Sequence, residues 1–210
     1  MLAKGSYSWI GAAILFTLIS GYISMMSGGF LSRLFRFFFI LGFLLTIFFF
    51  IFFRDPERKP QGGEDDAVSP ADGKVITLDG RCICIFMNIY DVHVNRAPLA
   101  GRITVIDYKP GGFIPAFFKD SDINERNHVV IETEYGTVEL FQIAGILTRR
   151  IVSYISEGGH VKRGERIGMI RFGSRVDVHI PETYEFTVKL NATVKAGETV
   201  IAMRKEKIRR

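Results

Sequence analysis

A glycine–serine pair interrupts a strand-like segment near the C-terminal end of the sequence. In MIRFGSRVDVHIP, residues 169–181, apolar and polar residues alternate from Val176 onward, but Gly173 and Ser174 stand where a strand favours β-branched residues. A serine hydroxyl after glycine can attack the preceding carbonyl, because glycine lacks a Cβ and tolerates strained backbone. The amide becomes an ester, and β-elimination then breaks the chain and leaves a pyruvoyl group. From the dipeptide alone, an ordinary turn is the more frequent explanation.

Other chemistries find little support in the residue spacing. The four histidines lack the spacing of a zinc-binding helix, and no carboxylate cluster accompanies them. FGSRV lacks the second glycine of the G-x-S-x-G elbow of serine hydrolases. No lysine lies in a phosphate-cradling context, as a pyridoxal phosphate enzyme requires. We therefore expect neither a metal site nor pyridoxal phosphate.

The charge distribution argues against nucleic acid as a partner. The formal net charge is +5, but residues 1–53 hold three cations and no acid, and the remainder holds 24 basic and 22 acidic residues. No long basic stripe and no aromatic RNA-binding motif accompanies this near balance. Cys82 and Cys84 stand two apart in an apparent strand, which makes them a poor disulfide pair and too few for zinc. We interpret both as reduced core residues of a cytosolic domain.

The N-terminal region is predicted to be a membrane anchor, residues 1–53. Two apolar helices, about 9–26 and 34–53, approach the length needed to cross a bilayer, with SGGF at 27–30 as the turn. A cleaved signal peptide fits less well because a second apolar stretch follows the first. Re-entrant or interfacial insertion is the alternative to a transmembrane hairpin.

The positive charges beside the apolar segments suggest an orientation. Lys4 and the N-terminal amine would lie on the same side as Arg54, Arg58 and Lys59, with Arg33 and Arg36 in the intervening loop. This count favours both ends on the cytoplasmic face, with the main domain inside the cell. We therefore expect the protein at the cell membrane, with its catalytic domain on the cytoplasmic side.

Residues 68–210 are predicted to form a mainly β domain after a polar linker, residues 54–67. Short strand-like runs alternate with turn residues, and no long helical period is present. HVKRGERIGMI (160–170) and TVKAGETVIAM (193–203) share the pattern V-K-x-G-E-x-[IV]. Two strand–turn–strand copies are too few for a solenoid and are typical of a lipoyl-like, barrel-sandwich fold.

An ordered set of motifs resembles the phosphatidylserine decarboxylase proenzyme family, in particular its short membrane-anchored type of archaea and bacteria. The resemblance covers residue 52 to the end. The motifs are FFRDPER (52–58), SPADGKV (69–75), DVHVNRAP (91–98), PGGFIPAF (110–117), NERN (124–127), GGHVKRGERIG (158–168) and FGS (172–174).

The resemblance implies self-cleavage between Gly173 and Ser174. A β subunit (1–173) and an α subunit (174–210) would form a heterodimer, alone or within a higher homo-oligomer. The pyruvoyl group derived from Ser174 would replace pyridoxal phosphate and form a Schiff base with the serine headgroup of a phospholipid in the bilayer. Loss of carbon dioxide would then yield the ethanolamine lipid. Whether the substrate is phosphatidylserine or archaetidylserine stays open, because the headgroup chemistry is the same.

The resemblance also assigns supporting residues. Asp72 matches an aspartate that supports self-cleavage, with an Asp-Gly turn as the alternative. His93 matches a histidine that interacts with the substrate carboxylate or transfers the proton. The alternative is a histidine at a strand edge whose hydrogen bonds are satisfied within the fold. Longer relatives carry a second histidine three residues later, where this chain has Arg96, a poor general base.

Either another group activates Ser174, with His179 and His128 as candidates, or the local backbone strain needs little help. The same two histidines are also candidates for binding the substrate. Arg96 is suited to bind the lipid phosphate or the substrate carboxylate. Arg126, in NERN, is a second candidate cation for the headgroup, and a charged surface strand is its alternative.

A lipoyl-like binding module tethered to the membrane is the competing class of function. The V-K-x-G-E repeats favour it. However, Lys162 and Lys195 lack the neighbours of a modified carrier lysine, and no long helical hairpin separates the halves, as a membrane-fusion adaptor would need.

Overall fold

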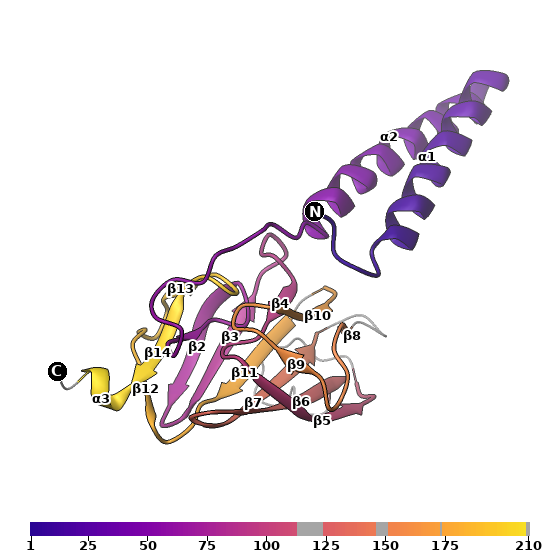
Figure 1. Ribbon diagram of the computed structural model, residues 1–210. Coiled ribbons are helices and arrows are strands. Elements are labelled where there is room, and N and C mark those ends of the chain that lie inside the picture. The colour runs from indigo at the N-terminus through magenta and orange to yellow at the C-terminus, as the bar shows by residue number, and fades with distance from the viewer. Residues whose placement is uncertain (113–123, 146–150, 173, 209–210) are drawn as a thin grey trace. The chain divides into compact units, whose positions relative to one another are not determined.

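The computed structural model describes residues 1–112, 124–145, 151–172 and 174–208. By its internal contacts the chain divides into two compact units, Met1–Pro56 and Glu57–Arg210 (Figure 1). The first unit is helical and the second is built mainly of strands. A mainly β domain after two apolar helices agrees with the fold class expected from the sequence.

The first unit contains helices α1 (Tyr7–Met26) and α2 (Gly29–Phe52), both long and apolar enough to cross a membrane. Helix α2 begins five residues earlier than predicted, so Arg33 and Arg36 lie inside it and the prediction that they lie in a loop is wrong. Only Ser27 and Gly28 separate the helices. Long cationic side chains are tolerated near a helix end because their apolar stems can lie along the helix while the charge reaches water.

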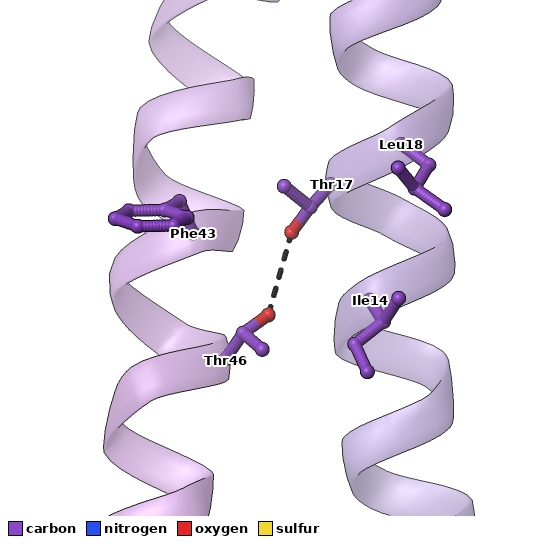
Figure 2. A pocket seen from close by; sticks show the side chains of 5 residues that line it. All are labelled: Ile14, Thr17, Leu18, Phe43 and Thr46. Carbon is purple, nitrogen blue, oxygen red and sulfur yellow. Dashed lines mark hydrogen bonds between the residues drawn. The ribbon is translucent and has the colours of Figure 1, made fainter.

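Small and hydroxylated residues line the contact between the two helices. A Cβ on Gly42 would come within 2.6 Å of Thr17 Oγ1, so glycine allows a close approach there. The Thr17 and Thr46 hydroxyls lie 3.5 Å apart, and each also donates to a carbonyl one turn earlier in its own helix (Figure 2). Ile14, Leu18 and Phe43 complete a small apolar pocket beside this pair.

An eight-stranded antiparallel sheet forms the main part of the second unit and curls around its core (Figure 1). In spatial order its strands are β13 (Thr193–Val194), β2 (Gly73–Asp79), β3 (Cys82–Met87), β11 (Ser174–His179), β7 (Gly136–Ala144), β6 (Arg126–Thr133), β5 (Gly101–Lys109) and β9 (His160–Val161).

Two three-stranded sheets complete the domain. One has the order β4 (Val94–Arg96), β10 (Arg166–Ile170) and β8 (Ile151–Ser153). The other has the order β1 (Ala67–Val68), β14 (Val200–Arg204) and β12 (Tyr184–Phe186), and the short helix α3 (Lys205–Ile208) follows it.

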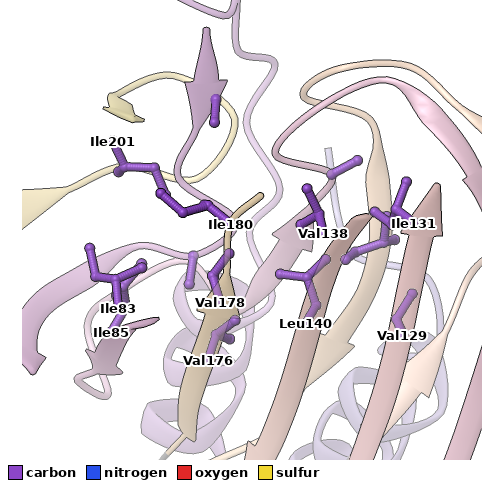
Figure 3. Packing of buried hydrophobic residues seen from close by; sticks show 14 of the residues in the cluster. Ile83, Ile85, Val129, Ile131, Val138, Leu140, Val176, Val178, Ile180 and Ile201 are labelled. Carbon is purple, nitrogen blue, oxygen red and sulfur yellow. The ribbon is translucent and has the colours of Figure 1, made fainter. Parts of the chain in front are cut away.

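One hydrophobic core joins all three sheets. Alternate residues of β11, Val176 and Val178, point into it together with Ile85 of β3 and Leu140 of β7 (Figure 3). Side chains directly opposite on paired antiparallel strands share a face, so the register defines an inner, core-facing side of the large sheet and an outer side. Ile170 of β10 and Ala67 of β1 belong to the same cluster.

The glycine–serine break separates two strands of different sheets. Strand β10 ends at Ile170 in a three-stranded sheet, and β11 begins at Ser174 in the eight-stranded sheet. The strand-like pattern of residues 169–181 is therefore not one continuous strand but parts of two strands in different sheets.

The two V-K-x-G-E segments form equivalent turns. Gly164 and Gly197 both have positive φ, +76° and +67°, which glycine adopts without the steric cost that a Cβ brings. The Gly164 N–H donates to the Ala97 carbonyl at 2.8 Å, and the Gly197 N–H donates to the Ser69 carbonyl at 2.6 Å. The sequence repeat is thus a structural repeat, as the barrel-sandwich prediction requires.

The two cysteines differ from their prediction as core residues. Cys82 and Cys84 are free thiols and half-buried. They pair with His179 and Asp177 of β11, which lie on the outer side of the sheet, whereas Ile83 and Ile85 between and beside them face the core. Strand alternation therefore places both thiols away from the core, on one face as predicted.

Candidate active site

Ser174 lies at the first position of β11, the strand between β3 and β7 in the large sheet. It pairs with Met87 on one side and with Ala144 on the other. Its residue parity is that of Val176 and Val178, so its side chain belongs to the inner face, and it is fully buried. Within the described part of the chain, Ser174 Oγ has no hydrogen-bond partner. A buried hydroxyl without a partner is costly in a folded protein and is a frequent sign of a functional group.

The residue two positions before Ser174 has an unusual backbone conformation. Phe172 has a φ of +60°, in the left-handed region. For an aromatic residue this conformation costs on the order of 1–2 kcal/mol. Gly173, predicted to carry the attacked carbonyl, lies outside the described residues. The strained residue therefore stands directly before the predicted scissile pair.

His93 is buried beside the start of β4 and has a defined tautomer. Its Nδ1 lies 2.9 Å from the Asp91 carbonyl oxygen, and the residue is 1% exposed. A carbonyl oxygen only accepts hydrogen bonds, so Nδ1 carries the proton and, in the neutral ring, Nε2 is the basic atom. The His93 carbonyl accepts the Ile170 N–H at 3.2 Å, which holds His93 against the end of β10, four residues before Ser174.

His93 lies directly before β4, and Asn95 is the middle residue of that strand. Asn95 contacts Met87 and Gln142 on the inner face. Met87 is the cross-strand partner of Ser174. The fold thus brings Asn95 to the end of the core that contains Ser174, and His93 precedes Asn95 by two residues.

Asp72 is a buried carboxylate whose acceptor positions are filled. Arg58 donates to both of its oxygens, with Arg58 Nη2 2.8 Å from Asp72 Oδ2. The Ala196 N–H donates to Oδ1 at 2.7 Å and the Val92 N–H to Oδ2 at 3.4 Å. Through Val92, Asp72 positions the segment that carries His93. This arrangement is suited to a positioning role for Asp72, and none of its hydrogen bonds among the described residues goes to Ser174.

Arg58 was not among the predicted site residues. Its Nη1 also donates to the Ala196 carbonyl at 3.1 Å, so one guanidinium joins the FFRDPER motif, the SPADG motif and the second repeat turn. The signal in the sequence was its place in a motif of the resembling family. Its partner could not be read from the linker alone.

Arg96 packs between the two repeat turns. It is 4% exposed, its Nη1 donates to the Gly164 carbonyl at 3.0 Å, and a Cβ on Gly197 would come within 2.4 Å of its Cδ. Arg96 and Asn95 are neighbours in β4, so their side chains point to opposite sides. The structure therefore directs Arg96 to the turns and does not bring it to Ser174.

Three predicted residues lie on the outer face of the large sheet. His128 stacks on Phe141 with ring centroids 4.2 Å apart, and its Nε2 lies 2.9 Å from Glu139 Oε2. His179 makes an edge contact with the same ring. Arg126 pairs with Ile143, which is opposite Arg175 of β11. Because Ser174 faces inward, the structure does not bring these three side chains to it.

Arg171 is a cation that the sequence analysis did not single out. It precedes Ser174 by three residues and is half-buried. Burial lowers the pKa of its guanidinium, and the nearby Tyr154 and Glu125 oppose this shift. A partly desolvated arginine beside the break is suited to bind an anionic group.

No metal site emerges from the described residues. Among them, no group of three His, Cys, Asp or Glu side chains is arranged to hold an ion. A buried hydroxyl and buried amide groups are present at this end of the core.

Comparisons with known proteins agree on one family. A family model described as phosphatidylserine decarboxylase matches residues 45–202. A protein of Methanosarcina mazei with the provisional name archaetidylserine decarboxylase proenzyme is 49% identical over 204 residues, 96% of either chain. Its counterpart of Methanosarcina acetivorans is 50% identical over 204 residues, with the same coverage. The phosphatidylserine decarboxylase proenzyme of Streptomyces griseus is 51% identical over 155 residues, 71% of either chain.

Proposed function

The chain belongs to the phosphatidylserine decarboxylase family, and on that premise we propose that it is a membrane-bound, pyruvoyl-dependent enzyme. It converts a serine phospholipid, phosphatidylserine or archaetidylserine, to the ethanolamine phospholipid and carbon dioxide. The observation that carries the proposal is the environment of Ser174. Its buried hydroxyl has no partner in the described part of the chain and follows a residue in left-handed conformation.

The first reaction is cleavage of the chain before Ser174. Ser174 Oγ adds to the Gly173 carbonyl carbon, the C–N bond breaks, and an ester and a free amine result. Removal of the Ser174 Hα as a proton then breaks the Cβ–O bond, which leaves a carboxylate on Gly173 and dehydroalanine at position 174. One water hydrolyses the imine tautomer, ammonia leaves, and a pyruvoyl group caps residues 174–210. Atoms balance with one water consumed.

His93 is the proposed base in this step. Hydrogen bonding of Nδ1 to the Asp91 carbonyl leaves Nε2 as the basic atom, and the bond from the Ile170 N–H to the His93 carbonyl holds the residue against the end of β10. Asp72, held by Arg58, supports this position through the Val92 N–H. Arg96, which replaces the second histidine of longer relatives, would then have a structural role.

The surroundings of residue 174 fit a pyruvoyl group. Met87 and Ala144 flank it on the inner face, and a methyl ketone is no larger than the serine it replaces. Such a group supplies an electrophilic carbonyl that takes up the electron pair released with carbon dioxide. The burial of Ser174 and His93 supports exclusion of bulk water, and His93 would give a proton back to the product. Arg171 is proposed to bind the anionic headgroup.

The N-terminal helices are proposed to anchor the enzyme in the bilayer that contains its substrate. Both are long and apolar enough to cross a membrane. Lys4, Arg54 and Arg58 would lie on the cytoplasmic side, and the catalytic domain with them.

The experiment is a comparison of full-length wild type with Ser174→Ala in membranes or detergent. We expect wild type to run as two chains, the smaller one starting at residue 174, blocked to Edman degradation and lighter by one ammonia than a chain with N-terminal serine. Ser174→Ala should stay intact and inactive. Supplying diacyl and diether serine lipids separately would identify the tails. Wild type that decarboxylates either lipid as one full-length chain would refute the proposal.

A further inference from the structure

A chain of buried amide side chains ends beside Ser174. Asn127 Nδ2 donates to Gln142 Oε1 at 2.9 Å, Gln142 Nε2 donates to Asn95 Oδ1 at 2.8 Å, and Asn95 Nδ2 points to Met87 Sδ at 3.8 Å. None of the three amides is more than 2% exposed. Gly168 leaves room for them, since a Cβ there would come within 3.1 Å of Gln142 Nε2.

The direction of this amide chain follows from its last member. A thioether sulfur accepts hydrogen bonds weakly and donates none, so the amide group that faces Met87 must be the NH2 of Asn95. The Asn95 oxygen then accepts from Gln142, whose own oxygen accepts from Asn127. Each amide polarises the next in the same sense, which strengthens the final donor.

The final donor has a poor partner for a fully buried group. Asn95 is 0% exposed, and its Nδ2 meets only a sulfur at 3.8 Å among the hydrogen-bond partners found in the described residues. An amide NH2 carries two hydrogens, and a buried donor without a good acceptor costs about 1–3 kcal/mol. A charged oxygen accepts such a hydrogen bond more strongly than a thioether does.

The position of Asn95 relative to Ser174 is set by the sheet. Met87, which Asn95 contacts, is the direct cross-strand partner of Ser174, and Gln142 precedes its other partner, Ala144, by two residues. All of these side chains belong to the inner face. The carbonyl that Ser174 attacks is bonded to the Ser174 nitrogen, and Ser174 lies at this end of the core.

We propose that Asn95 is a catalytic residue of self-cleavage, and this rests on the function proposed above. Its Nδ2 donates a hydrogen bond to the oxygen that becomes negatively charged when Ser174 Oγ adds to the carbonyl. The hydrogen bonds of Gln142 and Asn127 fix the direction in which the Asn95 donor points. Donors that are fixed before reaction and aimed at a developing oxyanion in a site without water are among the largest contributions to acyl transfer.

The test compares Asn95→Leu with Ile131→Leu. The first removes the donor, and the second changes a buried core side chain of β6 while leaving the amide chain in place. We expect Asn95→Leu to slow self-cleavage by roughly 10²–10³-fold, the usual effect of losing one oxyanion donor. Ile131→Leu keeps the volume nearly constant and should cleave at close to the wild-type rate.

Hydroxylamine separates the two halves of the reaction. It cleaves the ester intermediate and releases a smaller chain with a free N-terminal serine. Because the ester forms through the oxyanion, hydroxylamine should not restore cleavage of Asn95→Leu. Restoration to the wild-type rate would place Asn95 in the elimination step and overturn the proposal.

Asn95→Asp is the second variant, since it is isosteric and keeps the acceptor for Gln142. Thermal unfolding of each variant in the Ser174→Ala background reports folding without cleavage. Wild-type cleavage by either folded variant, or failure of both to fold, would overturn the role of Asn95. If wild type itself does not cleave, the proposed function fails instead, so the two failures are distinguishable.

Discussion

The guanidinium of Arg58 and the carboxylate of Asp72 form a buried, bidentate ion pair between the linker and the residues directly before β2. The side chains are only 9% and 10% exposed. The same carboxylate accepts N–H groups from Val92 and Ala196, which are distant in sequence. The pair therefore ties residues before and after Ser174 to the segment that carries His93.

Arg58→Ala should destabilise the domain strongly, because it leaves the Asp72 carboxylate buried without its counter-charge. We expect a loss of about 3–5 kcal/mol in the free energy of unfolding, measured by urea in the Ser174→Ala background. Arg81→Ala is the matched control, since Arg81 and Glu182 form an exposed ion pair, and it should cost about 0–1 kcal/mol. Equal losses in the two variants would contradict the assignment.

His93→Gln should slow self-cleavage by roughly 10²–10⁴-fold, the range expected for a lost general base. His128→Gln and His179→Gln should cleave at close to the wild-type rate, because both rings lie on the outer face. Pulse-chase electrophoresis of the precursor measures all three. A slow His179→Gln beside a normal His93→Gln would reverse the assignment.

Phe172→Asn should slow self-cleavage about fivefold. Asparagine adopts positive φ more readily than phenylalanine, so the variant relieves about 1 kcal/mol of strain in the precursor and raises the barrier to cleavage. Asn191, with a φ of +68°, provides the control, and Asn191→Gly should leave the rate unchanged. An unaltered rate for Phe172→Asn would show that the strain does not assist the reaction.

The C-terminal ion pair of Lys207 with Asp65 should contribute stability in a defined pH window. The hydrogen bond from Lys207 lowers the pKa of Asp65, and the same bond raises the pKa of Lys207. The contribution is therefore complete between the ordinary values, 3.8 and 10.5, and is lost as the pH falls through the lowered Asp65 pKa or rises through the raised Lys207 pKa.

Urea unfolding of Ser174→Ala with and without Lys207→Ala measures this contribution. We expect a difference of less than about 1 kcal/mol at neutral pH, since the pair is partly exposed, and a smaller one in acid below the Asp65 pKa. A difference that grows in acid would have the wrong sign for this ion pair.

Cys82 should react with iodoacetamide before Cys84. The hydrogen bond with Cys84 lowers the pKa of Cys82, whereas Cys82, burial and Asp177 raise the pKa of Cys84. The thiolate is the reactive form, so the lower pKa predicts faster alkylation. Peptide mass spectrometry after brief labelling checks the order, and Asp177→Asn should speed the labelling of Cys84.

Much of the site follows from residue order and strand parity. His179 is five residues after Ser174 in one strand, so alternation alone places it on the opposite face. His128 lies in another strand, and only the register with Phe141 and Asp177 shows its side of the sheet. His128 and His179 were therefore both candidates from the sequence, although alternation and strand pairing place both on the face opposite Ser174.

Long-range partners were beyond reach from the sequence. Arg58 sits in a polar linker, and nothing local indicates that its guanidinium meets Asp72. Arg96 seemed suited to an anionic ligand, but the approach of Gly164 and Gly197 encloses it. Likewise, Asn95 acquires its importance only when β4 is placed against Met87 and Gln142.

The placement of β11 has a consequence for the lifetime of the enzyme. Residues 174–210 contribute strands to the eight-stranded sheet and to one three-stranded sheet, and β11 pairs on both sides with strands that precede the break. Before the cut, folding is a reaction of one molecule with itself. After it, the same architecture would have to be rebuilt by an encounter of two chains, one too short to fold alone, so recovery from unfolding depends on concentration. The proposed cleavage would thus make the persistence of the fold depend on how slowly it opens.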